Sequence, residues 1–149
     1  MAQEWRQGDY LISTDRSRLD LSIIHSFLTT SYWAGGIPIE IIKRSIKHSL
    51  AFGVYKEDKQ VGFARVITDY ATFAYIGDVF ILEEYRGQGL SKWLMQVIAD
   101  HPDLQGLRRW ILITRDAHGL YRKTGFREPK DPERYMEKVF QDIYKKDVP

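Results

Sequence analysis

The segment Arg86-Gly87-Gln88-Gly89-Leu90-Ser91 is the part of the sequence best suited to bind an anion. It joins a strongly apolar segment to one whose apolar residues have helical spacing. Glycine has no Cβ, so the backbone there can approach a ligand closely. The first N–H groups of a helix lack partners within the helix and attract phosphates. The segment therefore predicts a phosphate or pyrophosphate site, and a simple tight turn between strand and helix is an alternative of equal weight.

Two common phosphate-binding loops do not match this turn. The dinucleotide fingerprint requires a further glycine at the sixth place counted from Gly87, where Lys92 stands. The P-loop ends in Gly-Lys followed by Ser or Thr, whereas Gly89 is followed by leucine. The turn thus still indicates a phosphate-bearing partner, but neither loop motif identifies that partner as NAD or ATP.

The residue patterns before the turn predict strands and helices that would hold it. In chain order they are an edge strand 5–14, a helix 20–30, a loop 31–38, a second helix, and a hairpin of strands 51–55 and 61–67. Asp20 is a suitable N-cap for the first helix. The second helix is predicted from an apolar stripe formed by Ile39, Ile42, Ile46 and Leu50.

The second half predicts a strand on each side of an amphipathic helix. The expected elements are a central strand 73–82, a helix from Leu90 that ends near 101–102, a buried strand 109–114, a short helix 116–123, and closing strands at Phe126 and 135–139. A strand, a helix and a further strand in this order form a parallel crossover. The whole chain therefore predicts an α/β fold whose sheet is antiparallel at first and parallel later.

Composition limits the class of protein. A length of 149 residues, 17.5 kDa, predicts one domain spanning residues 1–149. The absence of cysteine excludes disulfides, cysteine-ligated zinc and a cysteine nucleophile, and the scattered histidines suggest no metal site. A net charge of +2 gives no reason to expect nucleic acid. We also expect no membrane contact and no secretory signal, and therefore a cytoplasmic location.

Two motifs resemble the GCN5-related N-acetyltransferase (GNAT) superfamily. The stretch from Val79 to Ser91 looks like its acetyl-CoA motif, Arg/Gln-x-x-Gly-x-Gly/Ala, with serine in the last place. The stretch 120–126, Leu-Tyr-Arg-Lys-Thr-Gly-Phe, looks like its Leu/Phe-Tyr-x-x-x-Gly-Phe signature. The tyrosine lies 35 residues after Arg86, with one helix and one strand between, as in the family. The resemblance spans about residues 5–140.

The resemblance implies a GNAT-like mixed, mostly antiparallel central sheet that is flanked by helices and splayed at its central strands. It also implies acetyl-CoA as the acetyl donor. The pantetheine arm would bind the backbone of Val79, Phe80 and Ile81, which are otherwise ordinary core residues. The pyrophosphate would bind the turn and helix start, formed by Arg86, Gly87, Gln88, Gly89, Leu90, Ser91 and Lys92. Thr114 replaces a frequent asparagine of the family, and its hydroxyl could still bond to the cofactor.

The resemblance also implies the catalytic groups. Tyr121 matches the tyrosine that serves many members as general acid, and a phenol with a pKa of about 10 keeps its proton at pH 7. A packing role is the alternative. Asp78 is the first choice for the general base. An acid within an apolar strand also needs a partner, so a structural role is nearly as well supported.

The acceptor site is expected between the first two helices and the opposite strand. Aromatic side chains that could stack on a flat or cationic acceptor are Tyr32, Trp33, Phe73 and Tyr75, and a core role is equally possible for Trp33 and Phe73. We therefore expect an acetyl-CoA-dependent N-acetyltransferase that acts on a primary amine of a small molecule, as a monomer or homodimer. The alternative is a sensor of the same fold that binds acyl-CoA without turning it over.

Overall fold

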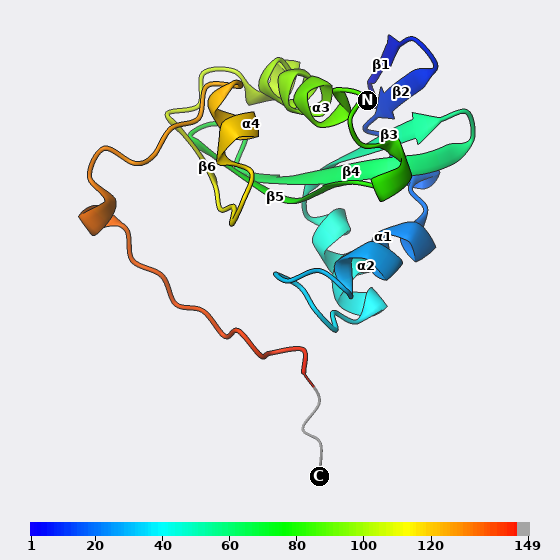
Figure 1. The fold of residues 1–149 in the computed structure, drawn as a ribbon. Helices are drawn as coiled ribbons and strands as arrows, with labels where there is room; N and C mark the ends of the chain where they lie inside the picture. Colours follow the sequence, from blue (N-terminus) through cyan, green and yellow to red (C-terminus); the bar gives the residue numbers. More distant parts are fainter. Residues whose placement is uncertain (146–149) are drawn as a thin grey trace.

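The computed structural model describes residues 1–145, and its centre is a six-stranded sheet (Figure 1). The strands are β1 (Glu4–Gln7), β2 (Tyr10–Ser13), β3 (Leu50–Lys56), β4 (Lys59–Thr68), β5 (Phe73–Ile81) and β6 (Arg109–Leu112). They lie in sequence order across the sheet. The first five pair antiparallel, and β6 pairs parallel to β5. The predicted mixed sheet with a late parallel crossover is therefore confirmed.

Four helices cover the two faces of the sheet. α1 (Leu21–Leu28) and α2 (Ile39–Lys47) lie on one face, and α3 (Leu90–Ala99) and α4 (His118–Arg122) on the other (Figure 1). The Asp20 side chain accepts a hydrogen bond from the Ile23 amide at 3.1 Å, so the predicted cap of α1 is confirmed. Across residues 1–145, the longest helix has ten residues, and none is long and apolar enough to cross a membrane.

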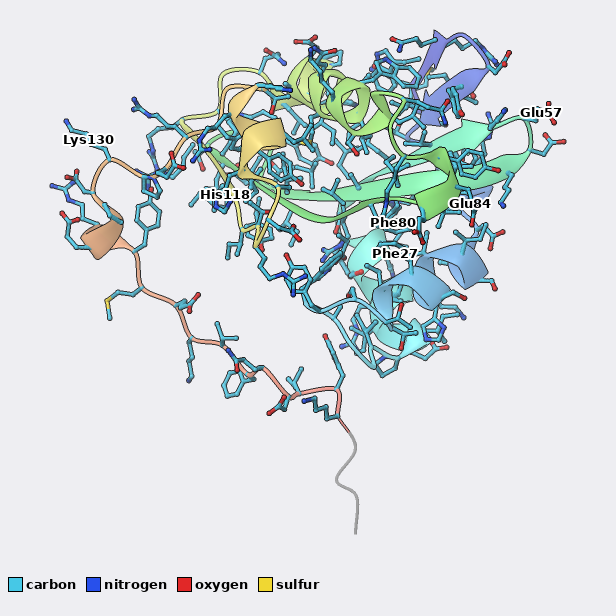
Figure 2. All side chains as sticks on the ribbon, viewed as in Figure 1. Phe27, Glu57, Phe80, Glu84, His118 and Lys130 are labelled. Carbon is cyan, nitrogen blue, oxygen red and sulfur yellow. The ribbon has the colours of Figure 1, made fainter. Side chains whose placement is uncertain are left out.

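Each face of the sheet has its own apolar core. On the α3 face, strand residues such as Val54, Val66 and Ile76 pack against Leu94 and Ile98. On the α1 and α2 face, the core includes Ile24, Leu28, Ile42, Phe63 and Phe80. The Phe80 ring stacks on Phe27 of α1 with the ring centroids 4.0 Å apart (Figure 2). These clusters fix both helical layers to the strands that carry the candidate site.

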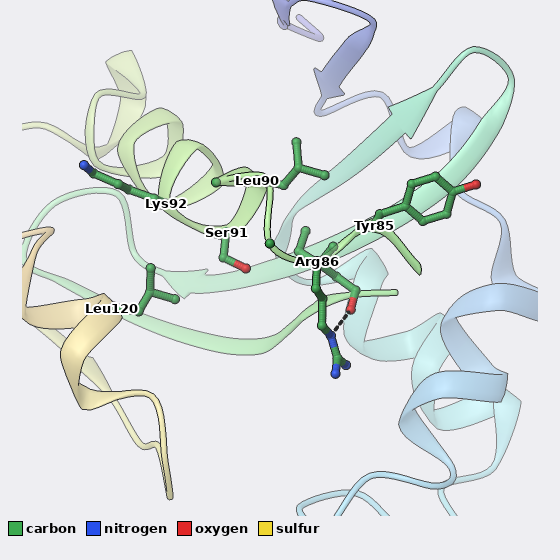
Figure 3. A pocket seen from close by; sticks show the side chains of 9 residues that line it. Tyr85, Arg86, Leu90, Ser91, Lys92 and Leu120 are labelled. Atoms are coloured by element: carbon green, nitrogen blue, oxygen red, sulfur yellow. Dashed lines mark hydrogen bonds between the residues drawn. The ribbon is translucent and has the colours of Figure 1, made fainter. Parts of the chain in front are cut away.

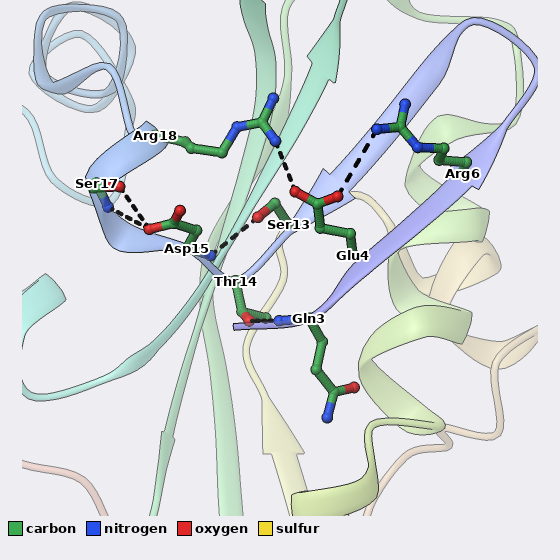
Figure 4. Close-up of polar contacts among 8 residues, drawn as sticks. All are labelled: Gln3, Glu4, Arg6, Ser13, Thr14, Asp15, Ser17 and Arg18. Atoms are coloured by element: carbon green, nitrogen blue, oxygen red, sulfur yellow. Dashed lines mark hydrogen bonds and ion pairs between the residues drawn. The ribbon is translucent and has the colours of Figure 1, made fainter. Parts of the chain in front are cut away.

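The N-terminal strand prediction was incomplete, because residues 5–14 form part of a hairpin. The chain reverses at Gly8, which has a φ of +57°, and β1 pairs back on β2. Polar contacts hold the hairpin to the following segment (Figure 4). The Gln3 amide donates to the Thr14 hydroxyl at 2.9 Å, and the Arg18 guanidinium pairs with the Glu4 carboxylate at 2.8 Å.

Three further predictions were wrong. Leu50 belongs to β3 and not to the second helix, because α2 ends at Lys47. The expected buried strand 109–114 is the shorter β6, which lies at the sheet edge with at most half-buried side chains. The expected closing strands at Phe126 and 135–139 do not form, and residues 113–145 contain no strand. Residues 135–140 instead run clear of the sheet as an exposed segment (Figure 1).

Candidate active site

The candidate site begins where β5 extends beyond the end of β6. Their last pair is Ile76 with Leu112, after which β6 ends and β5 continues to Ile81. Beyond Ile76, β5 therefore pairs with β4 alone among the described strands. Val79, Phe80 and Ile81, the residues predicted to bind pantetheine, lie on this stretch. Their backbone groups that face away from β4 are not used by the sheet and suit a ligand with amide groups.

A β-bulge in the same stretch re-aims the side chains of β5. Phe63 pairs with Phe80 and Arg65 with Gly77, so Ala64 lies opposite two residues, Asp78 and Val79. Asp78 has a φ of +55°, a conformation that aspartate tolerates better than most residues. In a regular strand, residues four positions apart such as Ile76 and Phe80 would lie on the same face of the sheet. Here Ile76 packs in the core on the α3 face, and Phe80 packs in the core on the opposite face. The bulge thus brings Asp78 to the face that carries Arg65.

The glycine turn forms a pocket of about 150 Å³ at the end of β5 (Figure 3). Gly87 and Gly89 have φ values of +81° and +80°, which favour glycine. A Cβ added at either position would meet no atom within 4 Å, so open space lies beside the backbone. The Arg86 Nε donates to the Ile81 carbonyl at 2.9 Å and ties the turn to the strand.

The start of α3 completes this pocket. No side chain caps α3 at Gly89, so the amides of its first turn are left for a ligand or water. Leu90, Ser91 and Lys92 line the pocket from this side, and Leu120 of α4 lines it from the other. An open cradle beside two glycines and an uncapped helix start fits the pyrophosphate of acetyl-CoA.

Gln88 is the one residue of the predicted turn that does not line the pocket. Its side-chain oxygen accepts from the Tyr10 hydroxyl at 2.9 Å, and its amide nitrogen donates to the Tyr85 carbonyl at 3.2 Å. Gln88 therefore holds the turn against the β1–β2 hairpin. A cofactor contact by its side chain would require these bonds to change.

Tyr121 lies on α4, directly after the pocket residue Leu120. Its ring is half-buried and meets the Phe126 ring edge-on, with centroids 6.2 Å apart. Burial raises the pKa of the Tyr121 hydroxyl above its usual value, and the neighbouring Tyr32 and Asp116 raise it further. The hydroxyl therefore stays protonated at neutral pH, which is the state that a proton donor requires.

Asp78 is the centre of a polar network that reaches the loop between α1 and α2. One carboxylate oxygen accepts from the Trp33 indole N–H at 2.9 Å, and the other pairs with the Arg65 Nε at 3.0 Å. The Arg65 and Asp78 side chains are only 17% and 12% exposed. The Arg65 guanidinium also donates to the Ser49 hydroxyl at 3.0 Å. This network fixes Trp33 to the bulge of β5.

Tyr32 connects the same loop to the segment after β6. The Arg115 amide donates to the Tyr32 hydroxyl at 3.2 Å, and the Arg115 guanidinium lies 3.9 Å from the centre of the Tyr32 ring. Tyr32 and Trp33 meet edge-on with centroids 5.0 Å apart, and they stay 53% and 42% exposed. The loop therefore carries two accessible aromatic rings between the bulge of β5 and the β6–α4 segment.

Of the other predicted site residues, one lies beside the Asp78 network and two lie away from it. Tyr75 lies near Asp78 and Arg65, since both charges act on its hydroxyl. Burial and the Asp78 carboxylate raise the pKa of Tyr75, and the Arg65 guanidinium partly opposes this rise. Phe73 lies apart, at the start of β5, where it pairs with Arg109. The Thr114 hydroxyl accepts from the Ala117 amide at 3.0 Å, so it stabilises the approach to α4.

Arg65 and Arg115 were not identified from the sequence. A signal existed for Arg65, because a charged residue inside the apolar segment 61–67 requires a partner. Asp78 presents the complementary charge in the next strand. Arg115 carried no comparable signal, since its contact with Tyr32 joins residues 83 positions apart.

Comparison with known proteins identifies the family of the chain. Residues 47–128 match the model of an acetyltransferase (GNAT) domain. A Gibberella zeae protein named "Putative acetyltransferase" is 35% identical over 144 residues, which cover 81% of this chain and 80% of that protein. An uncharacterized N-acetyltransferase of Porphyra purpurea is 33% identical over 102 residues, 64% of this chain and 58% of that protein.

A solved structure also resembles this chain over nearly its whole length. It is a GNAT-family protein of Xanthomonas campestris pv. campestris, 50% identical, with a TM-score of 0.91 and coverage of 95% of this chain and 100% of that one. The match over residues 47–128, together with these relatives, shows that the chain belongs to the GNAT family of acetyltransferases.

Proposed function

We propose that this acetyltransferase uses acetyl-CoA to acetylate a primary amine of a small molecule. The observation that carries the proposal is the position of α4. Leu120 lines the glycine-turn pocket, while the next residue, Tyr121, is close enough to Tyr32 of the acceptor loop for that residue to affect its pKa. In this proposal, the cofactor pocket, the proton donor and the aromatic acceptor loop lie around one short helix.

Acetyl-CoA, when bound, supplies an acetyl group activated as a thioester. The amides of the glycine turn and of the first turn of α3 would hold its pyrophosphate, and Arg86 and Lys92 would add positive charge. In Figure 3 these two side chains extend in different directions from the turn, so each would reach a different part of the cofactor. The open backbone edge of Val79–Ile81 would take the pantetheine amides.

Tyr121 is the proposed general acid. The departing sulfur has a conjugate acid with a pKa of about 8.5, so a positioned phenol can protonate it at neutral pH. Because its pKa is raised, the Tyr121 hydroxyl would keep its proton until the thiolate departs. The neighbouring Phe126 ring fixes the orientation of the phenol.

Asp78 is the proposed base for the incoming amine, directly or through water. Its carboxylate also fixes Trp33, so the same residue would position the acceptor loop. The exposed Trp33 ring would attract a cationic amine through its face, whereas a face of the Tyr32 ring already carries the Arg115 guanidinium. These roles can be separated by mutation, as described below.

A release assay tests the proposal. We expect free thiol to form from acetyl-CoA only when a suitable member of a panel of small amines is present. We also expect acetyl-CoA to raise the melting temperature, because a ligand that binds only the folded state stabilises it. A raised melting temperature with no thiol release from any amine, peptides included, would instead support the acyl-CoA sensor.

A further inference from the structure

Arg115 differs from the other arginines of the candidate site in how its donor groups are used. Arg65 and Arg86 each donate from Nε to a protein oxygen, at 3.0 and 2.9 Å. Within residues 1–145 the Arg115 guanidinium donates no hydrogen bond, and its side chain is 65% exposed. A guanidinium presents five N–H donors in a fork that fits the oxygens of a carboxylate or phosphate. The unused fork of Arg115 therefore suits an oxyanion supplied by a ligand.

Tyr32 holds this guanidinium in place. The Arg115 Cζ lies 3.9 Å from the centre of the Tyr32 ring, and the Arg115 backbone amide donates to the Tyr32 hydroxyl at 3.2 Å. The same segment is closed by the Thr114 hydroxyl, which accepts from the Ala117 amide at 3.0 Å. An arginine that is already ordered loses less conformational entropy on binding than a free surface arginine. Tyr32 is thus a positioning residue for Arg115.

One acidic side chain competes for Arg115. The Asp116 Oδ2 lies 3.7 Å from the Arg115 Nη2, and the Asp116 side chain is 70% exposed. This distance is too long for a hydrogen bond, and an exposed pair of this kind contributes little to stability. Asp78, on the far side of the acceptor loop, is paired with Arg65 at 3.0 Å. The charge of Arg115 therefore remains available to an anion.

The guanidinium also lies close to the proposed proton donor. The β6–α4 segment that carries Arg115 meets the α1–α2 loop at Tyr32 (Figure 1). Tyr32 and Asp116, which both contact Arg115, are the two residues that raise the pKa of Tyr121 beyond the effect of burial. Trp33 meets the same Tyr32 ring, with the ring centroids 5.0 Å apart. A ligand that contacts both Trp33 and Arg115 would therefore lie beside Tyr121.

We propose that the acceptor amine also carries an anionic group, a carboxylate or a phosphate, and that Arg115 binds this group. This inference rests on the proposed acetylation of an amine and narrows its substrate class. The fork of Arg115 would hold two oxygens of the anion through parallel N–H···O bonds. The cationic amine would face the Trp33 ring. Because Trp33 and Arg115 contact one and the same Tyr32 ring, the two charged groups of the acceptor would be only a few bonds apart.

Matched pairs of amines test this substrate class. β-Alanine and its amide differ in the carboxylate, and phosphoethanolamine and ethanolamine differ in the phosphate. The wild-type kcat/KM should be roughly 10–100-fold higher for the anionic member of a pair, the effect expected of a charged hydrogen bond. A preference within the first pair identifies a carboxylate, and one within the second pair identifies a phosphate. Equal values within both pairs would overturn the inference.

Variants of Arg115 show whether the preference comes from its guanidinium. Arg115→Gln should raise KM for the anionic amine by the same factor and leave the neutral amine unchanged. Arg115→Lys keeps the charge but loses the fork, so it should restore only part of the preference. Arg6→Gln is the matched control, because it removes an exposed charge on β1 at the opposite edge of the sheet. A preference that survives Arg115→Gln, or that Arg6→Gln removes equally, would contradict the assignment.

Saturation-transfer NMR of the same four amines, with CoA present, measures binding without turnover. Preferential binding of an anionic amine that is lost in Arg115→Gln, with no thiol release from acetyl-CoA, would support the anion site and refute the proposed acetylation. Thiol release without any anionic preference would support the acetylation and refute the anion site. Equal binding within both pairs, or no binding of either anionic amine to the wild type, would likewise refute the anion site.

Discussion

At the residue scale, Tyr121 combines a raised pKa with a position directly after Leu120, which lines the pocket of the glycine turn. Tyr121→Phe removes the hydroxyl but keeps the ring that meets Phe126. We expect kcat to fall by roughly 10²–10⁴-fold, the usual contribution of one acid–base group. The melting temperature and the affinity for CoA should change little.

The exposed Tyr135→Phe serves as the control and should leave kcat unchanged. Because the pKa of Tyr121 is raised above that of an ordinary tyrosine, the wild-type kcat should not fall until the pH is above the ordinary tyrosine range. A Tyr121→Phe enzyme with normal kcat, measured where chemistry limits the rate, would remove the general-acid role.

Asp78 has two proposed roles that can be separated. Asp78→Asn keeps the shape and one acceptor for the Trp33 indole, but loses the negative charge beside Arg65. If Asp78 is the base, kcat should fall by roughly 10²–10⁴-fold with KM for the amine little changed. If Asp78 only positions the loop, KM for the amine should rise with kcat nearly preserved.

Trp33→Phe gives the comparison for the positioning role. It keeps an aromatic ring but removes the N–H that bonds to Asp78. We expect a several-fold rise in KM for the amine and an unchanged affinity for CoA. An equal loss of CoA affinity would show that the loop supports the cofactor site rather than the acceptor site.

At the element scale, the function of the glycine turn depends on how β5 leads into α3. Gly89→Asp places a negative charge at the helix start where the pyrophosphate would bind, and it strains a backbone with a φ of +80°. We expect the stabilisation by acetyl-CoA in thermal melts to be largely lost. The physical cause is repulsion between the carboxylate and the phosphates.

Gly106→Asp controls for the backbone strain. Gly106 has a φ of +77° and, like Gly89, open space where a Cβ would be. It lies outside the pocket, so this variant should lose similar intrinsic stability but keep the shift caused by acetyl-CoA. If both variants lose the shift equally, the turn is not part of the cofactor site.

At the scale of the whole molecule, His101 links stability to pH. Its side chain is 2% exposed, between the Trp5 and Phe52 rings, and its Nδ1 accepts from the Asp103 amide at 3.0 Å. Burial lowers the pKa of His101, and the nearby Asp103 opposes this only in part. The unfolded chain therefore binds the proton more readily than the folded one.

The free energy of unfolding should therefore be highest above the ordinary histidine pKa of about 6.5 and fall as the pH drops below it. Urea melts between neutral pH and about pH 5 measure this slope. His101→Asn keeps an acceptor for the Asp103 amide but loses the ring that packs between Trp5 and Phe52, so stability at neutral pH should fall. Because the titrating imidazole is gone, the dependence of stability on pH should flatten. A slope that His101→Asn leaves unchanged would contradict this assignment.

The sequence alone determined the elements that depend on neighbouring residues. The cap of α1, the β3–β4 hairpin, the strand before the glycine turn and the helix after it all follow from patterns within a few residues. The glycine turn and the Leu120–Phe126 motif were found for the same reason. Their positions along the chain, together with the parallel crossover, were sufficient to identify the family.

Only the tertiary structure decided which distant side chains meet. The bulge at Asp78 adds one residue to β5 and so reverses which of the following side chains point to each face of the sheet. No local pattern of residues reveals where this bulge lies. That single residue determines that Asp78 meets Arg65 and Trp33, which is 45 positions away. The expected strand at 135–139 failed for a related reason. A strand forms only where the edge of a neighbouring strand is within hydrogen-bonding reach, so the residues of 135–139 alone do not decide whether the segment pairs.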